Sequence, residues 1–249
     1  MEDQQARSHY DAAFYERIRA GSTRSAQIVL PVAFDWTGLP TSVVDVGCGS
    51  GAWLVACQTL GVPDILGMDG THVNPESLLI PKDQFVTIDL ETPPPIPRRF
   101  DLAMSLEVGE HIPTRCSAAY VAFLTGLSDW VLFSAAIPGQ GGVHHVNEQR
   151  PAFWQRLFND HGYVMLDPIR PRIWHDPDVE MFYAQNALLY VKESLVKSTP
   201  RLDAERQRVQ RSRLTVIYQD IAWGDPDVPA AARTLAQALR RSIRHHLGL

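Results

Sequence analysis

The sequence has few cysteines and no long hydrophobic run. Its three cysteines, Cys48, Cys57 and Cys116, form no C-x-x-C pair, which argues against a disulfide framework and against a thiolate zinc site. The longest apolar runs, residues 28–34 and 131–137, are far shorter than the ~20 residues that cross a bilayer. The N-terminal segment mixes acids, bases and aromatics and lacks the apolar core of a signal peptide. We therefore expect reduced thiols, no membrane span and a cytoplasmic location.

The charge of the chain is unevenly distributed. The formal net charge is −5, but the segment from Lys197 to the C-terminus holds ten basic against five acidic residues. The rest of the chain holds 13 basic against 23 acidic residues. An acidic body disfavours nonspecific nucleic-acid binding, which needs clustered cations. The basic segments 201–223 and 229–247 have helical patterns, and we interpret them as helices that pack on the body or form a homodimer or partner contact.

Five short apolar runs alternate with segments of helical character. The runs have the pattern of strands, and four of the five carry an acidic residue at or near the C-terminal end. This alternation indicates an α/β fold with a doubly wound parallel sheet, whose ligands bind beyond the carboxyl ends of the strands. The length of 249 residues and the hydrophobic content of 45% fit one such domain with appendages. The expected strands are residues 42–46, 64–69, 84–90, 100–107 and 130–137.

Later segments are expected to complete the domain. Residues 150–161 have the pattern of an amphipathic helix that ends at Gly162. The apolar segments 163–167 and 182–192 predict the last two strands. Between them, residues 171–186 mix aromatic and acidic residues, which predicts a lid or substrate loop. Aromatic residues more often belong to a core than to a site. The candidates for lining a substrate site are Trp154, Trp174, His175 and Tyr183.

The sequence VVDVGCGSGAW, residues 43–53, places three glycines between the first expected strand and a helix. Glycines leave the backbone open to a ligand, and the start of the helix offers free N–H groups. Asp45 lies near the end of that strand, and Asp69, which ends the second strand, is placed to bind both hydroxyls of a ribose. The loop departs from the G-x-G-x-x-G of dinucleotide folds, and an acid before it repels phosphate. These features disfavour a nicotinamide dehydrogenase.

The series DVGCGSG, GMDG, TIDLE and FDLAMSLEVGEHI resembles the motifs of class I S-adenosylmethionine-dependent methyltransferases, over residues 25–192. The resemblance implies a Rossmann-like, seven-stranded sheet that binds S-adenosylmethionine. It places the ribose on Asp69, the adenine near Asp89 and the methionine end near Glu107. A cofactor with an ammonium and a sulfonium but no phosphate suits an acid-lined cleft. The cofactor residues that the resemblance implies are Asp45, Gly47, Gly49, Gly51, Asp69, Gly70, Asp89, Leu90, Glu107, Tyr15 and Ser25.

The segment upstream of the glycine loop, residues 14–31, resembles a helix that caps the cofactor in many such enzymes. Tyr15 and Ser25 are its candidate contacts, and an amphipathic helix with one packed tyrosine is the alternative. The resemblance therefore divides the chain into three parts. These are the capping helices at 1–40, the methyltransferase domain at 41–196 and a C-terminal helical extension at 197–249.

Two clusters of acids and histidines follow the fourth and fifth expected strands. Glu107, Glu110 and His111 have the spacing i, i+3 and i+4, which places them on one face if the chain turns helical there. The segment PGQGGVHHVNEQ, residues 138–149, brings two further histidines to the same edge of the sheet. Histidine titrates near neutral pH and is the usual base for a hydroxyl acceptor, whereas an amine acceptor needs no strong base. The candidate catalytic residues are His111, His144 and His145.

The E-x-x-E-H spacing with a later histidine is similar to the metal-binding set of small-RNA 2′-O-methyltransferases and of ubiquinone-pathway O-methyltransferases. This similarity implies a divalent ion such as Mg²⁺ on Glu107, Glu110, His111 and His145, with His144 as the other choice for the last ligand. Such an ion would hold an acceptor hydroxyl and lower its pKa. In the alternative interpretation Glu107 binds the cofactor, Glu110 is a capping or solvated residue, and His111 packs or contacts substrate.

The segment NEQRPAFWQRLFNDHGY resembles a stretch of bacterial methyltransferases of secondary metabolism and surface glycans, which implies a small polar acceptor. We therefore predict an enzyme that moves a methyl group to a hydroxyl, or an amine, of a small metabolite, sugar or natural-product intermediate. An RNA methyltransferase that uses the basic C-terminal segment is one alternative. A noncatalytic binding subunit that keeps the cofactor fold is another, although its motifs are complete.

Overall fold

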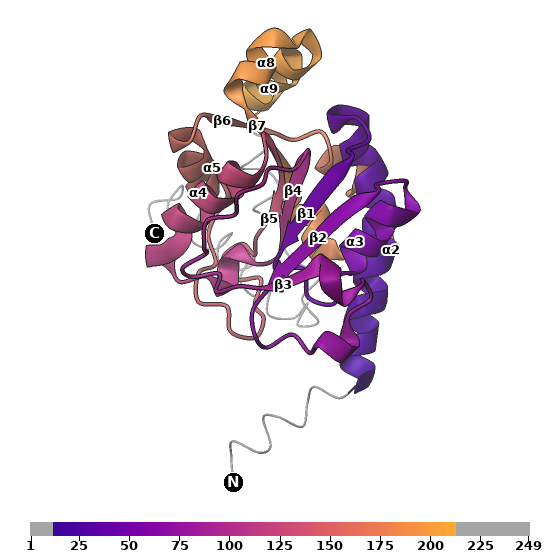
Figure 1. The fold of residues 1–249 in the computed structure, drawn as a ribbon. Coiled ribbons are helices and arrows are strands. Elements are labelled where there is room, and N and C mark those ends of the chain that lie inside the picture. The colour runs from indigo at the N-terminus through magenta and orange to yellow at the C-terminus, as the bar shows by residue number, and fades with distance from the viewer. Residues whose placement is uncertain (1–11, 213–249) are drawn as a thin grey trace, which may run out of the picture. The chain divides into compact units, whose positions relative to one another are not determined.

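A computed structural model describes residues 12–212, with side chains from residue 20 to residue 210. The side chain of Tyr15 and most of the two basic segments at 201–223 and 229–247 lie outside this part. None of the described helices is long and apolar enough to cross a membrane. Helices flank a central sheet on both sides (Figure 1). A homodimer through the C-terminal extension stays a prediction.

The sheet has seven strands in the order β3-β2-β1-β4-β5-β7-β6. All pairs are parallel except those of β7, which runs antiparallel to β5 and β6. The predicted α/β fold is confirmed. The strands are β1 (Ser42–Val46), β2 (Asp64–Asp69), β3 (Phe85–Thr87), β4 (Leu102–Leu106), β5 (Trp130–Ser134), β6 (Tyr163–Leu166) and β7 (Leu188–Lys192). The α-helices are α2 (Ala12–Thr37), α3 (Ala52–Thr59), α4 (Ser117–Leu127), α5 (Pro151–Asp160), α6 (Arg170–Ile173), α7 (Met181–Asn186), α8 (Glu193–Ser198) and α9 (Pro200–Ser212). The 3₁₀ turns are η2 (Pro75–Ser77), η3 (Lys82–Gln84), η4 (Gly109–His111) and η5 (Thr114–Cys116).

Two layers of helices bury the two faces of the sheet. On one face, Leu30 of α2 and Trp53 of α3 belong to one apolar cluster with residues of the strands. On the other face, Tyr120 of α4 and Phe158 of α5 belong to a second cluster. The central strands β1, β4 and β5 are covered on both sides, and nearly all of their residues are buried. This double burial explains why their sequences are continuous apolar runs rather than alternating ones.

Two expectations for the segment before the last strand are wrong. The apolar pattern predicts one strand over 182–192, whereas its first half belongs to α7 and only Leu188–Lys192 form β7. The predicted loop at 171–186 likewise contains the helical turns α6 and α7. A short apolar run is compatible with a strand or with a helix, and tertiary contacts decide between them. Tyr183 on α7 is buried, and Trp53 Nε1 donates to its hydroxyl at 3.3 Å.

The antiparallel course of β7 brings an extra segment to the ligand edge of the sheet. Parallel strands present their last residues at this edge, where ligands of such folds bind. An antiparallel strand presents its first residues there instead. Asn186, at the end of α7, therefore lies beside Glu107, which follows β4, and Asn186 Nδ2 donates to Glu107 Oε1 at 3.1 Å.

The last described helices are joined to the edge of the sheet. On α9, Arg208 Nη2 donates to the main-chain oxygen of Asp167, the residue after β6, at 2.7 Å. The buried carboxylate of Asp167 in turn accepts from Arg170 Nε at 2.9 Å and from Nη2 at 2.7 Å. The chain from residue 197 to Ser212 is thus fastened to the domain that contains β6.

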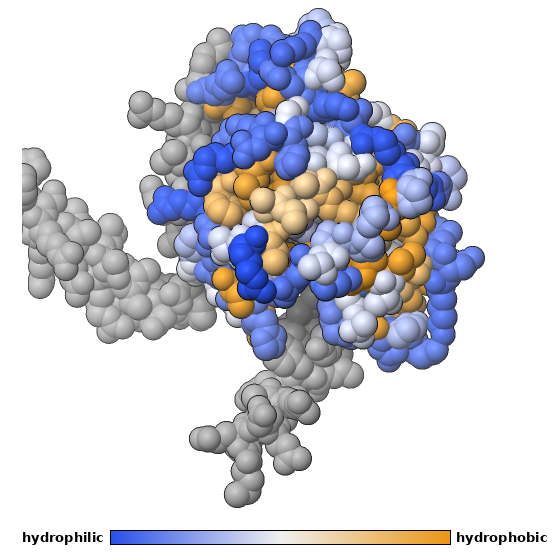
Figure 2. All heavy atoms as spheres, turned by 60° about the vertical axis from the view of Figure 1, so that its left-hand side comes forward, coloured by the Kyte–Doolittle hydropathy of each residue, from blue (hydrophilic) through white to orange (hydrophobic). Residues whose placement is uncertain are grey.

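The α4–α5 side of the molecule exposes apolar surface. Figure 2 turns this side forward and shows apolar residues bordered by hydrophilic ones. α4 has the sequence SAAYVAFLTGL, without a charged residue. Tyr120, Val121 and Leu124 are buried on its inner side, and Phe123 is half-buried. A helix that is apolar on all sides leaves apolar groups on the outer surface.

Candidate active site

The glycine loop connects β1 to α3 in a conformation that favours glycine. Gly47, Gly49 and Gly51 have φ angles of +83°, +54° and +86°, in the left-handed region that side chains disfavour. A Cβ on Gly47 would lie 2.3 Å from Cγ2 of Val108. Around Gly49, by contrast, no atom of the described residues lies within 4 Å of such a Cβ. Packing therefore requires Gly47, whereas Gly49 faces open space that a ligand can enter.

Asp69, at the end of β2, is held beside this loop. Its Oδ2 accepts from Gly49 N at 2.7 Å, and its Oδ1 accepts from Gly70 N at 2.6 Å. His72 Nε2 lies 3.4 Å from the same Oδ1. Each carboxylate oxygen has two acceptor positions, so a carboxylate that is held by two amides can still accept from two hydroxyls. The side chain is thus oriented in advance, which reduces the cost of binding a ligand.

Asp45 lies on β1, beneath the loop, and is buried. Burial raises the pKa of its carboxyl group to about 8, and the neighbouring Asp69 contributes to this shift. Both causes disfavour the charged form. A cationic ligand group beside Asp45 would reverse them and favour the ionised carboxylate.

The remaining predicted cofactor residues lie in different surroundings. Asp89 is exposed after β3, and a hydrogen bond from Thr92 Oγ1 at 2.7 Å lowers the pKa of its carboxyl group. Leu90 is half-buried against the core cluster of α4 and α5. Ser25 on α2 is buried, and its Oγ accepts from Glu180 N at 2.9 Å, so it holds the segment that precedes α7.

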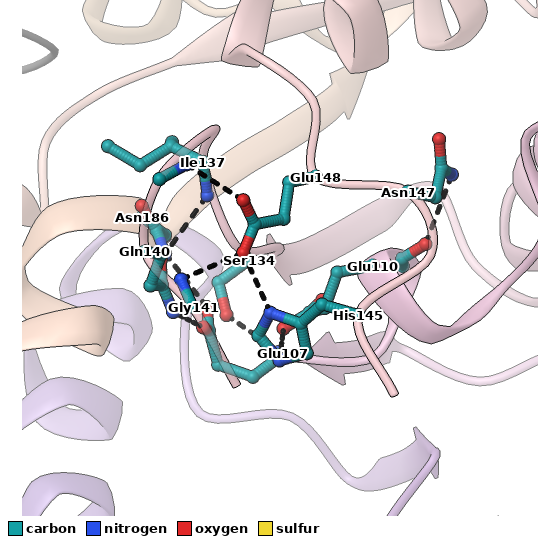
Figure 3. A network of polar contacts seen from close by, with 12 residues as sticks. Glu107, Glu110, Ser134, Ile137, Gln140, Gly141, His145, Asn147, Glu148 and Asn186 are labelled. Atoms are coloured by element: carbon teal, nitrogen blue, oxygen red, sulfur yellow. Dashed lines mark hydrogen bonds and ion pairs between the residues drawn. The ribbon is translucent and has the colours of Figure 1, made fainter. Parts of the chain in front are cut away.

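Glu107 follows β4 and is held by two amide side chains from distant segments (Figure 3). Its Oε2 accepts from Gln140 Nε2 at 2.7 Å, and its Oε1 accepts from Asn186 Nδ2. Burial raises the pKa of Glu107, and these hydrogen bonds oppose the shift. Glu107 and His144 are non-glycine residues with positive φ, +56° and +59°. Such strain is typical of functional sites.

A group of three residues lies next to Glu107. Glu110, His111 and His145 each offer one ligand atom, and these atoms lie within 4.8 Å of one another. The Glu110 side chain is 1% exposed, and neither of its carboxylate oxygens has a hydrogen-bond partner among the described residues. Burial and the nearby Glu107 raise the pKa of Glu110 to about 9. A buried carboxylate without a partner is unfavourable, and a bound cation stabilises it.

The local backbone differs from the predicted helical face. The spacing predicts a helix after β4, whereas the chain forms only the 3₁₀ turn Gly109–His111, and Glu107 lies before it and outside the group of three. A Cβ on Gly109 would lie 2.8 Å from the ring of Trp154. Trp154 is 2% exposed and packs beneath this turn, and its place in a substrate site stays a prediction.

A glutamate closes the loop that follows β5 (Figure 3). Glu148 Oε2 accepts from Gly139 N at 2.7 Å, and Oε1 accepts from Gly141 N at 2.9 Å and contacts His145 Nδ1 at 3.0 Å. Partial burial raises the pKa of Glu148, but these hydrogen bonds outweigh it and the net shift is downward. When Nδ1 donates to Glu148, the Nε2 of a neutral ring is an acceptor. This Nε2 lies 4.0 Å from Glu110 Oε1.

The same loop is joined to η4. Val146 N and Asn147 N both donate to the main-chain oxygen of Glu110, at 2.9 and 3.0 Å. Asn147 is buried, and its Nδ2 donates to Ser117 Oγ at 2.9 Å. These bonds bring His145 to Glu110.

The other predicted bases and aromatic residues differ in exposure. Partial burial and the neighbouring His145 lower the pKa of His111, which favours a neutral ring that can bind a metal or accept a proton. His144 is exposed at the tip of its loop. Gln140 and Asn186 lie in the segments 138–149 and 171–186 that the sequence singles out, but they are not among the predicted site residues, because no local pattern distinguishes them from their neighbours. The remaining substrate-site candidates are the half-buried Trp174, the exposed His175 and the buried Tyr183.

Comparison with known proteins finds similarity to a methyltransferase domain. Residues 15–134 match a family model described as a methyltransferase domain. No curated protein matches the sequence. This match covers 120 of the 249 residues, and the motif series within it lies on the seven-stranded sheet.

Solved structures share this fold. DesVI from Streptomyces venezuelae aligns with a TM-score of 0.53 and 16% identity, over 72% of this chain and 95% of that chain. The magnesium protoporphyrin IX methyltransferase of Synechocystis, solved with S-adenosylmethionine, aligns with a TM-score of 0.50 and 22% identity. The alignment covers 70% of this chain and 81% of that chain. CalO1, a methyltransferase in calicheamicin biosynthesis solved with S-adenosylhomocysteine, aligns with a TM-score of 0.51 and 15% identity. The alignment covers 76% of this chain and 59% of that chain. The matched segment spans 64% of a Bacillus halodurans chain solved as a candidate methyltransferase. At these identities the similarity establishes the fold.

Proposed function

We propose that the chain transfers the methyl group of S-adenosylmethionine to a hydroxyl oxygen of a small molecule. In this reaction the acceptor oxygen attacks the methyl carbon in line, and the sulfur leaves with the bonding electron pair as S-adenosylhomocysteine. The hydroxyl proton must pass to a base. The observation that carries the proposal is the pair of His145 and Glu148, 3.0 Å apart, at the ligand edge of the sheet.

In the proposed mechanism His145 Nε2 accepts the hydroxyl proton. Glu148 holds the ring through Nδ1, which sets the tautomer and stabilises the imidazolium that forms. Two loop amides hold Glu148 itself, so the pair is oriented before the acceptor binds. An amine acceptor would gain little from such a pair, which is why oxygen is the favoured acceptor.

The predicted cofactor residues have positions that support this proposal. The open space at Gly49 and the oriented carboxylate of Asp69 support contacts with the methionine part and the ribose. Gly70, Asp89 and Leu90 follow the ends of β2 and β3, on the side assigned to the adenine.

Several observations support a small acceptor. The magnesium protoporphyrin methyltransferase and CalO1 are named for small-molecule chemistry. The ligand edge of the sheet gathers acidic side chains and not the clustered cations that bind RNA. These acids are Asp45, Asp69, Glu107 and Glu110.

A second candidate is that a divalent ion assists the transfer. The group of Glu110, His111 and His145 fits an ion, and the partnerless carboxylate of Glu110 favours one. A bound ion would lower the pKa of the acceptor hydroxyl. One carboxylate and two imidazoles suit Mn²⁺, Fe²⁺ or Zn²⁺ better than Mg²⁺, which prefers oxygen ligands. His145 would then be a ligand and not the base.

Calorimetric titration of the full chain with S-adenosylmethionine and with NAD, each with and without Mn²⁺, tests the cofactor. We expect a dissociation constant of about 1 μM for S-adenosylmethionine and no binding of NAD.

Transfer of labelled methyl groups to phenols, sugars, amines and total RNA then tests which molecule accepts the methyl group. Labelled hydroxylated molecules support the proposal, and labelled RNA would replace it with the nucleic-acid alternative. Cofactor binding without turnover favours the noncatalytic subunit. Loss of turnover with a chelator, restored by Mn²⁺, favours the metal-assisted reaction.

A further inference from the structure

We propose that the acceptor carries its hydroxyl on an apolar framework, such as a phenol ring, and that Val143 and Val146 bind this framework. The inference rests on the proposed function, because it names the substrate class of the same reaction. It concerns the loop at 138–149, in which the proposed base His145 stands between the two valines. A sugar, which the sequence leaves open as an acceptor, presents hydroxyls in place of such a framework.

The first observation is that the loop exposes its apolar side chains. Val143 is 47% exposed and Val146 is 62% exposed. Val146 is the most exposed large apolar residue in the described part of the chain. A single exposed valine is common on a protein surface and needs no explanation. Two of them on either side of a proposed base, however, give the surroundings of a reactive group an apolar character.

The second observation is that the same loop pairs its polar side chains (Figure 3). Glu148 accepts from two main-chain amides of the loop, and Gln140 Nε2 donates to Glu107 Oε2 at 2.7 Å. Asn147 is buried, and its Oδ1 accepts from Gln149 Nε2 at 3.0 Å. An ordinary surface loop has the reverse arrangement, with its polar side chains in water and its valines packed inside.

This distribution of side chains decides which kind of acceptor fits. Over residues 140–149, the loop offers a ligand two exposed isopropyl groups and one exposed polar side chain, that of His144. Each hydroxyl of a sugar gives up water when it is bound and needs a hydrogen-bond partner in return, which the paired side chains do not provide. An apolar framework needs no such partner, and its contact with the valines removes apolar surface from water. The loop therefore matches an acceptor with few polar groups besides the reacting hydroxyl.

The third observation is the position of the valines beside the base. Val146 N donates to the main-chain oxygen of Glu110 at 2.9 Å, so its backbone is joined to the residue that faces His145. Val143 follows Gly142, where a Cβ would lie 2.3 Å from His145 Nε2. Each valine is thus the chain neighbour of a residue that forms or contacts the base. An acceptor whose hydroxyl reaches Nε2 has the rest of its framework within reach of both.

The test uses acceptors that differ only in apolar size. The full chain receives labelled S-adenosylmethionine with para-methylphenol, para-ethylphenol or para-propylphenol, and with methyl glucoside as the polar acceptor. Each added methylene should raise kcat/KM about twofold to fourfold, where fourfold corresponds to complete burial. The glucoside should be the poorest acceptor of the series.

Matched variants assign this preference to the valines. Val143→Thr and Val146→Thr each replace a methyl group by a hydroxyl of nearly the same size, and Val86→Thr, at a 40% exposed position on β3, is the control. The double variant should lower kcat/KM for para-propylphenol about 10-fold but that for para-methylphenol no more than about threefold. The loss should lie in KM, because the valines bind the framework and do not move the proton. The control should retain the wild-type values.

The outcomes separate this inference from the proposed function. Equal losses for all three phenols in the double variant would reveal a structural role of the valines and overturn the inference. A wild type that methylates the glucoside as well as para-propylphenol, or that gains nothing from added methylenes, would also overturn it and leave the proposed function intact. A wild type that labels only amines or RNA, or that binds the cofactor and labels nothing, would overturn the proposed function itself. Both positions are exposed, so the variants should fold, and circular dichroism checks this. If the double variant does not fold, each single variant must show the selective loss for para-propylphenol, and equal losses would overturn the inference.

Discussion

The two halves of the site are built in different ways. In the cofactor half, backbone groups fix the geometry: three glycines with positive φ form the loop, and two main-chain amides hold Asp69. In the acceptor half, side chains fix the geometry: Glu148 closes its loop, and Asn147 joins that loop to Ser117. A backbone conformation that needs glycine leaves a fixed pattern in the sequence, whereas a side-chain network can be formed in many ways. The following predictions, from the largest expected effect to the smallest, test this contrast.

The largest effect is expected from a methyl group on the loop backbone. Gly47→Ala should lower the free energy of unfolding by about 3 kcal/mol, because the left-handed φ and the contact with Val108 both oppose a Cβ. In Gly49→Ala only the left-handed φ opposes the Cβ, so the free energy of unfolding should fall by about 1 kcal/mol. Urea denaturation measures both. Equal losses would show that the contact with Val108 is not what requires glycine at position 47.

The acceptor half should respond in turnover and not in cofactor affinity. His145→Ala removes the proposed base and should reduce kcat about 100-fold, with S-adenosylmethionine affinity within about twofold of the wild type. Steady-state kinetics with an acceptor found in the labelling panel, together with calorimetry, measure the two effects. His144→Ala is the matched control, since His144 is exposed, and it should retain most of the activity. A His145→Ala enzyme with full kcat would exclude both the base and the ligand role.

Asp69→Asn tests the cofactor half with a side chain of nearly the same size. The variant loses the charge and one of the two hydrogen bonds from Gly49 N and Gly70 N, so the affinity for S-adenosylmethionine should fall about 10-fold or more. At saturating cofactor, kcat should stay near that of the wild type, because Asp69 is assigned to the ribose and not to the reacting atoms. Calorimetry and saturation kinetics separate the two quantities. A loss in kcat alone would place Asp69 in the chemical step.

The smallest effect, taken per pH unit, concerns the pH dependence of stability. Asp45 retains its proton in the folded chain up to about pH 8, whereas its ordinary pKa is 3.8. Between these values the unfolded chain binds fewer protons, so Asp45 makes stability fall as pH rises and has no further effect above about pH 8. We expect Asp45→Asn to reduce this decline by up to about 1 kcal/mol per pH unit between pH 5 and pH 8. Urea midpoints measure it. Asp89→Asn, at an exposed position, is the control, and an unchanged slope in Asp45→Asn would contradict the shifted pKa.

The contrast also explains which parts of the site the sequence predicts. The glycine loop, Asp69 and the strands that precede them follow from local pattern, because each lies within one continuous strand–loop–helix segment. The meeting of Glu110 with His145 follows only in outline, since the sequence shows two clusters at one edge but not the 3₁₀ turn Gly109–His111 that contains Glu110. Local spacing predicts a helical face there, and the packing of Trp154 on Gly109 decides otherwise.

Asn186 lies in the predicted lid or substrate loop at 171–186, but its individual place at the site has a topological reason. Ligands of such sheets bind beyond the carboxyl ends of strands, and Asn186 stands before a strand. Only the antiparallel pairing of β7 with β5 brings it to the ligand edge, and pairing direction is a property of the whole sheet. The same uncertainty makes α7 look like the start of a strand.

The loop at 138–149 has a consequence for how acceptor preference changes between related enzymes. Glu148 binds two amides and an imidazole from its own loop, so much of the loop's shape comes from within. Toward η4, two of its amides bond the main-chain oxygen of Glu110, a kind of acceptor that any sequence provides. A replacement loop would keep these main-chain bonds and leave the glycine loop and Asp69 unaltered, but it would have to supply again the side-chain bonds of Gln140 to Glu107 and of Asn147 to Ser117. Loop exchange thus leads to new acceptors on the same fold only when the new loop restores these two contacts.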